Sequence, residues 1–140
     1  MKWLFVGLTG IMLAVGGLFL TAGASSAKAE KHYRAPFVAE SDLAVTGKAE
    51  IQVDANDVAH IVIHVQGLIP GERFPTHIHE GASIEEPGPI LVALPDLVAN
   101  EAGVATLVAS IPNADTLDLA NRTIGTHLSD GTRIAKGAIE

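Results

Sequence analysis

The 140-residue sequence contains no cysteine, few aromatic residues and few basic residues. Without cysteine the chain can form neither a disulfide nor a zinc site with thiolate ligands. Aromatic side chains make up 4% of the residues, so a core has to be built from Val, Ile, Leu and Ala in a sequence that is 48% apolar. Lys and Arg total 9 against 16 Asp and Glu, and the formal charge of −7 would repel a phosphate backbone. A nucleic-acid partner is therefore not expected.

The N-terminus has the layout of an export signal. Lys2 precedes an uncharged apolar segment, Trp3 to Leu20, and small residues follow up to Ala27-Lys28-Ala29. This order predicts a signal peptide over residues 1–29, cleaved before Glu30, and hence a secreted, periplasmic or cell-surface protein without membrane contact after cleavage. Cleavage would leave 7 basic and 16 acidic residues, a formal charge of −9. The alternative is an uncleaved N-terminal anchor, because the apolar segment is just long enough to span a bilayer.

The rest of the chain divides into a short tether and one domain. Residues 30–42 mix charge, Pro36 and small residues without a clear period, and they are predicted to be a tether. Residues 43–140 are predicted to form the domain, in which apolar and polar residues alternate and turn residues recur about every ten positions. We expect an all-β, antiparallel Greek-key sandwich or flattened barrel of about eight strands. The predicted strands are 45–54, 58–66, 74–80, 88–94, 103–111, 122–128 and 132–139, with a hairpin end at 100–103 and a helical turn within 114–120.

Three of the six histidines form a candidate metal site. His77 and His79 flank Ile78, so on a strand both imidazoles lie on one face while Ile78 points into the core. His127 is predicted to project from a later strand beside Gly125, which leaves room around it. Surface histidines remain the alternative on this evidence alone. His60 and His64 are expected to be exposed on the polar face of another strand, and His32 falls in the tether.

Several segments in succession resemble the copper/zinc superoxide dismutase family. They are Gly67 to Gly71, His77 to Gly81, Leu94 to Leu97, Gly103 to Leu107, Asn121 to Ile124 with His127, and Gly131 to Ile139. The resemblance implies an eight-stranded Greek-key barrel with copper on its outer face. It also implies that His77, His79 and His127 are copper ligands and that Arg133 attracts superoxide to the copper. Gly81 and Gly137 match structural glycines of that family.

The sequence also departs from the family at several points. Only residues 81–89 separate His79 from the next strand, and they contain no histidine, so the bridging histidine and the zinc site are absent. Residues 128–132 replace the long charged loop that guides the anion. Lys136 stands where the family has a disulfide cysteine. The resemblance therefore implies a reduced member of the family with a copper site alone.

These observations leave three functions open. The first is an exported copper-binding protein that dismutates superoxide to O2 and H2O2, with activity that is weak or lost. The second is a non-enzymatic module that binds copper ions, and the same three imidazoles with water could instead hold zinc. The third is a structural or adhesive module, because His77 to Gly81 with Gly88 to Val92 is also similar to the chordin-type (CHRD) domain. A homodimer through exposed sheet edges is a further expectation.

Overall fold

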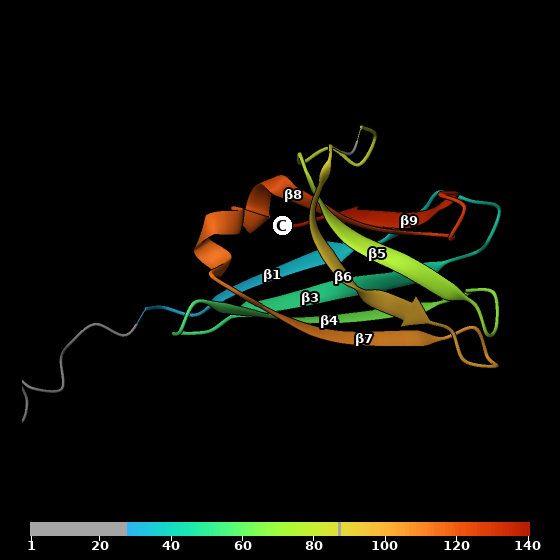
Figure 1. The fold of residues 1–140 in the computed structure, drawn as a ribbon, viewed down its shortest axis with the longest axis horizontal. Helices are drawn as coiled ribbons and strands as arrows, with labels where there is room; N and C mark the ends of the chain where they lie inside the picture. Colours follow the sequence, from blue (N-terminus) through green and yellow to red (C-terminus); the bar gives the residue numbers. More distant parts are fainter. Residues whose placement is uncertain (1–27, 87) are drawn as a thin grey trace, which may run out of the picture.

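The computed structural model describes residues 28–86 and 88–140, which form two facing antiparallel sheets (Figure 1). The predicted signal peptide lies outside the described residues except for Lys28 and Ala29. The strands are β1 (Lys31–Pro36), β2 (Val38–Ala39), β3 (Thr46–Val53), β4 (Val58–Gln66), β5 (Arg73–Glu80), β6 (Ile90–Val98), β7 (Ala105–Pro112), β8 (Arg122–His127) and β9 (Arg133–Ala138).

One sheet has the strand order β1-β3-β4-β7 and the other has the order β2-β9-β8-β5-β6. All the pairs are antiparallel, and the two sheets enclose one apolar core. The all-β sandwich prediction is confirmed, in the form of two sheets rather than a closed barrel. The two short 3-10 segments η2 (Ala114–Leu117) and η3 (Leu119–Asn121) coincide with the predicted helical turn at 114–120 and extend one residue beyond it.

The core follows the period of two that the sequence shows. Along β4, Ala59, Ile61, Ile63 and Val65 are completely buried while the residues between them are exposed. Phe74 is the largest fully buried side chain. Most of the remaining core is Val, Ile, Leu and Ala, as the low aromatic content requires. Strands such as β3 and β4 therefore have one buried face, and the opposite face is free to carry polar groups.

The predicted tether is wrong for most of its length. Lys31–Pro36 is a strand that pairs with β3 in unbroken register, and Val38–Ala39 pairs with β9. The other edge of β1 bonds to Glu140: Arg34 N–H donates to the Glu140 carbonyl over 2.9 Å, and Glu140 N–H donates to the Arg34 carbonyl over 2.8 Å. The folded domain thus begins well before residue 43, and its first strand contacts its last residue.

The predicted hairpin at 100–103 is also wrong. Asn100 closes a turn by accepting the N–H groups of Ala102 and Val104 on its side chain. However, β6 and β7 on either side of this turn belong to different sheets, so the turn carries the chain from one layer to the other. The turns at 54–57 and 129–131 do join paired strands, β3 to β4 and β8 to β9.

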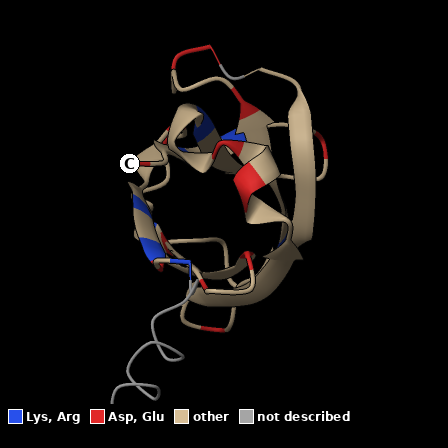
Figure 2. Cartoon of the chain, turned by 90° about the vertical axis from the view of Figure 1, so that its left-hand side faces the viewer, with Lys and Arg blue, Asp and Glu red and all other residues tan. Residues whose placement is uncertain are grey.

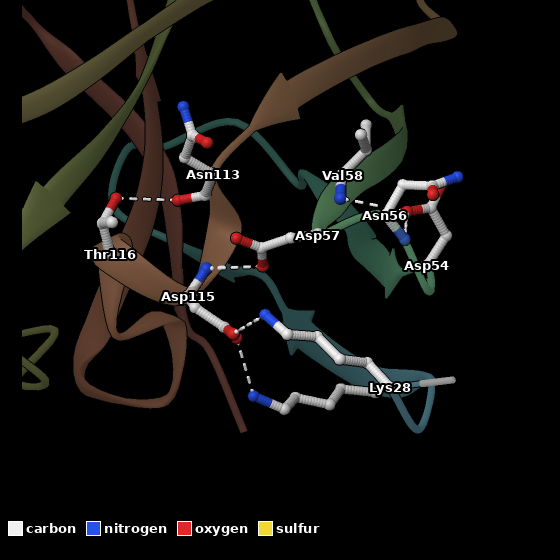
Figure 3. Close-up of polar contacts among 9 residues, drawn as sticks. Lys28, Asp54, Asn56, Asp57, Val58, Asn113, Asp115 and Thr116 are labelled. Carbon is white, nitrogen blue, oxygen red and sulfur yellow. Dashed lines mark hydrogen bonds and ion pairs between the residues drawn. The ribbon is translucent and has the colours of Figure 1, made fainter. Parts of the chain in front are cut away.

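Charged contacts hold the N-terminal end of the described chain against the 3-10 segments. Asp115 Oδ2 and Oδ1 accept Lys28 Nζ and Lys31 Nζ, each over 2.8 Å, and Asp57 Oδ1 accepts the Asp115 N–H over 2.9 Å (Figure 3). The two lysine contacts lower the pKa of Asp115 to about 2. Figure 2 shows acidic residues spread over the loops and 3-10 segments at this end of the sandwich.

Within the described residues, no helix is long and apolar enough to cross a membrane.

Candidate metal centre

The first two site histidines are placed by β5. Ile78 between them is completely buried, and His77 and His79 lie half-buried on the outer face of the five-stranded sheet. Their ring centroids are 5.8 Å apart and their ring planes are perpendicular. Burial of Ile78 therefore directs both imidazoles outward, as the alternation predicts.

The third histidine comes from the neighbouring strand β8, which pairs directly with β5. The His127 and His77 rings are stacked with centroids 5.0 Å apart, and His127 Nε2 lies 3.2 Å from His77 Nδ1. Ile124 and Thr126 of the same strand are buried, so His127 and Gly125 lie on the outer face. All three histidines therefore lie on the outer face of this sheet, and His77 and His127 are the pair whose ring nitrogens lie within hydrogen-bonding distance.

Backbone carbonyls orient two of these rings. His79 Nδ1 lies 2.9 Å from the Gly88 carbonyl oxygen, and His127 Nδ1 lies 2.8 Å from the Leu128 carbonyl oxygen. Because a carbonyl oxygen can only accept, the proton of each neutral ring is on Nδ1, and Nε2 carries the free lone pair. This is the type of second contact that fixes the tautomer of a metal-binding histidine.

The arrangement is only partly assembled for a metal. Among residues 28–86 and 88–140, no group of three or more His, Cys, Asp or Glu is arranged to hold a metal ion. His77 and His127 bring two ring nitrogens together, and His79 stands beside them. Burial, followed by the proximity of His127 and His79, lowers the pKa of His77, which favours a neutral ring with a lone pair to donate.

The donor set nevertheless suits a borderline metal such as copper, because neutral imidazoles are its common protein ligands. A further polar atom close to the site has no partner: Thr123, which pairs with His79 across the strands, has a fully buried hydroxyl without a hydrogen bond among the described residues. A buried hydroxyl without a partner calls for an explanation, and a bound water or ion is one. The imidazole donor set fits a copper ion.

Arg133 lies at the edge of this site on β9, in register with His127. Its side chain is 58% exposed, and Nη1 lies 3.9 Å from Glu40 Oε1. The structure therefore places Arg133 beside the histidines, with a carboxylate close to its guanidinium.

Two charged residues near the site were not predicted from the sequence. Lys136 is 7% exposed, and its Nζ lies 2.8 Å from Glu40 Oε1. A lysine within the otherwise apolar run from Ile134 to Ala138 is a signal in the sequence that this position is unusual. Glu40 carries no such signal, because it lies in the region that was predicted to be a tether.

The other three histidines lie on the opposite sheet. His32 is exposed on β1, and His60 and His64 are exposed on β4. His60 contacts Asp54 Oδ2 over 2.9 Å and Ser110 Oγ over 3.2 Å, while His64 contacts Thr106 Oγ1 over 2.9 Å. The predicted exposure of His60 and His64 is confirmed.

No family model matches the chain, and no curated protein matches it in sequence. Solved structures do match it. A SOD-like protein from Bacillus subtilis is 21% identical with a TM-score of 0.59, and the match covers 79% of this chain and 99% of that one. The fold is superoxide dismutase-like.

Two further structures support this assignment of the fold. The Cu(II) form of Candida albicans superoxide dismutase 5 is 16% identical with a TM-score of 0.55, covering 79% of this chain and 92% of that one. The clock protein EA4 is 12% identical with a TM-score of 0.60, covering 82% and 97%. At these identities the likeness establishes the superoxide dismutase-like sandwich and not a shared activity.

Proposed function

We propose that this protein is an exported, copper-binding member of the superoxide dismutase-like proteins, with weak or lost dismutation of superoxide. The observation that supports this most strongly is the meeting of His77 Nδ1 and His127 Nε2 at 3.2 Å, with His79 on the same face. Two metal ligands at about 2 Å from a common ion lie at a separation of this order.

The chain's own residues supply the ligands and their orientation. His77 Nδ1, His79 Nε2 and His127 Nε2 would hold the copper, because the carbonyls of Gly88 and Leu128 retain the protons of the other two ring nitrogens. A bound copper ion would supply one-electron redox chemistry. Arg133 would attract an anion to the same face of the sheet, although Glu40 at 3.9 Å offsets part of its charge.

Weak activity is expected from the short loops. Residues 128–132 form a tight turn, closed by a hydrogen bond from Leu128 N–H to the Thr132 carbonyl, and Gly88 N–H donates to the Glu80 carbonyl at the ends of the loop after β5. Neither loop contributes a basic residue, and the protein as a whole is acidic. Electrostatic steering can change association rates by roughly 10 to 1,000-fold, so its loss would slow encounter with superoxide.

Copper binding can be tested by titrating purified protein with copper and measuring metal content after dialysis. We expect one copper per chain, and loss of that copper in His77→Ala and in His127→Ala. His64→Ala is the matched control, because His64 is an exposed strand histidine of the other sheet. Unchanged copper content in both site variants would exclude this site. Absence of copper from the unmodified protein would favour a structural module of the CHRD type.

Dismutation is then measured on the copper-loaded protein. A rate far below the diffusion limit is expected, and Arg133→Ala should lower it further and make it less sensitive to salt. A rate near the diffusion limit would contradict the argument from the short loops. Copper binding with no dismutation at all would identify the protein as a copper-binding module without this activity.

A further inference from the structure

A serine, a histidine and an aspartate are linked in series on the outer face of the four-stranded sheet. His60 Nδ1 lies 3.2 Å from Ser110 Oγ, and His60 Nε2 lies 2.9 Å from Asp54 Oδ2. The histidine belongs to β4, the serine to β7, and the aspartate to the turn between β3 and β4. A hydroxyl, an imidazole and a carboxylate linked in this order are the catalytic triad of many hydrolases.

Asp54 sets the tautomer of His60. Asp54 Oδ1 accepts the N–H groups of Asn56 and Val58 over 2.9 and 3.0 Å (Figure 3), while Oδ2 faces the imidazole. The hydrogen bond with His60, followed by that with the Val58 N–H, lowers the pKa of Asp54. Since an ionised carboxylate can only accept, the proton of the neutral imidazole is on Nε2. Nδ1 can then accept the hydroxyl proton of Ser110 and act as its base.

The register of the sheet brings the hydroxyl and the imidazole together. His60 lies directly opposite Ser110 in the pairing of β4 with β7. Asp54 N–H donates to the Val58 carbonyl, so the backbone groups of Val58 point towards β3. By alternation along the strand, those of His60 also point towards β3 and not towards β7. His60 and Ser110 are therefore a non-hydrogen-bonded pair, the kind in which opposite side chains lie closest.

The surroundings of the triad can receive a small ester. Ser110 is exposed, and the His60 side chain is 50% exposed beside a hollow of about 550 Å³ that extends over β3 and β1. The same alternation directs the Ser110 N–H to the outer edge of β7, which no other described strand covers. This N–H can donate to the oxygen that becomes negative when an ester carbonyl is attacked. A single donor on an exposed surface gives little stabilisation, so only activated esters should react.

We propose that Ser110, His60 and Asp54 form a second, metal-independent site that hydrolyses activated carboxylic esters. Ser110 Oγ forms a bond to the ester carbonyl carbon while its proton passes to His60 Nδ1. The bond from that carbon to the leaving oxygen then breaks, and this oxygen takes the proton from His60, which leaves an acyl ester on Ser110. Water attacks the acyl ester in the same way, its proton passes through His60 to Ser110 Oγ, and the carboxylic acid is released. Asp54 is a positioning residue, because it acts through the tautomer of His60.

The test uses copper-free protein, because a metal on the other sheet could activate water for ester hydrolysis by itself. The protein is treated with a fluorophosphonate, which modifies nucleophilic serines, and the modified peptide is identified by mass spectrometry. We expect the label on Ser110, together with slow hydrolysis of p-nitrophenyl acetate that the label blocks. His60→Gln should slow both reactions about tenfold or more, and Ser110→Ala should reduce them to the buffer background.

His64 and Thr106 provide a matched control on the same two strands. His64 Nδ1 lies 2.9 Å from Thr106 Oγ1, but no carboxylate among the described residues contacts this ring. Thr106→Ser gives His64 the same type of hydroxyl that His60 has, without the aspartate. We expect no labelling at position 106 in this variant, and His64→Gln should leave both reactions unchanged.

Asp54→Asn separates the effect on the imidazole from the effect on the turn. The amide oxygen can still accept the two turn N–H groups, whereas the amide nitrogen would donate to His60 Nε2 and move the ring proton to Nδ1. The nitrogen chemical shifts of His60 should report this change of tautomer, and labelling of Ser110 should slow about tenfold or more. Absence of label on Ser110 in the unmodified protein, or an equal labelling rate in His60→Gln, would overturn the proposal. An unchanged rate in Asp54→Asn would remove Asp54 from it. All of these measurements are independent of whether the protein binds copper.

Discussion

Replacing Ile78 by alanine should destabilise the protein strongly, because this side chain holds the two β5 histidines in place. Ile78 is 0% exposed and lies directly opposite Ile124 of β8, which is equally buried. The substitution removes three buried carbon groups at about 0.8 kcal/mol each, and the remaining cavity adds about 24 cal/mol per Å³. The expected loss is about 3 to 4 kcal/mol in the free energy of unfolding.

Urea unfolding of the metal-free protein measures this loss directly, provided that the m-value is unchanged. Ile90→Ala is the matched control, because Ile90 belongs to the edge strand of the same sheet and is 56% exposed. Its replacement should lower the free energy of unfolding by less than about 1 kcal/mol. A loss of under about 1 kcal/mol for Ile78→Ala, or equal losses for the two variants, would refute the placement of Ile78 as the buried support of the site.

Three other predictions concern the remainder of the domain. Gly137→Ala should lower the melting temperature, because the added Cβ would collide with the Pro36 carbonyl oxygen. Gly125→Ala should leave the melting temperature nearly unchanged, because its Cβ would make only ordinary contacts. Equal effects of the two substitutions would contradict this prediction. With Lys28 and Lys31 both present, the pKa of Asp115 is about 2, below its ordinary value of 3.8, so its contribution to stability is complete above pH 3.8 and is lost as the pH falls towards 2. In uncleaved protein Asp115→Asn should therefore flatten acid unfolding in that range, and an unaltered acid profile would argue against the lysine contacts. N-terminal sequencing of the protein from its native host should begin at or within a residue or two of Glu30, and an intact Met1 in a membrane-embedded product would exclude cleavage.

The strands that could be predicted from the sequence are those with one strongly apolar face. Residues 58–66 alternate without interruption, and the predicted bounds of this strand agree with β4. Lys31–Pro36 was missed because Ala35 is its one fully buried residue, so an edge strand of this kind leaves almost no period of two in the sequence. The hairpin at 100–103 was wrong because a turn motif does not reveal whether the next strand pairs with the last one or changes sheet.

The residues of the candidate site also differ in whether their positions could be predicted from the sequence. His77 and His79 could be placed together because their relation is local, with one strand and one buried residue between them. The contact of Glu40 with Lys136 joins segments that are far apart in the chain. Glu40 is held beside β9 by its backbone N–H, which donates to the carbonyl of Ile134 on that strand. A tertiary contact of this kind leaves no spacing in the sequence, so the charge balance beside the histidines required the structure.

The pairing of Arg34 with Glu140 has a consequence for the timing of folding. β1 has β3 on one side, but on the other side it is closed by the last residue, through two backbone hydrogen bonds. Until the segment that contains Glu140 has folded against it, that edge of β1 has no partner and can pair with other extended chains. Because Arg34 and Glu140 are 106 positions apart in the chain, protection of this edge requires a non-local contact, and contacts of that kind form slowly in folding.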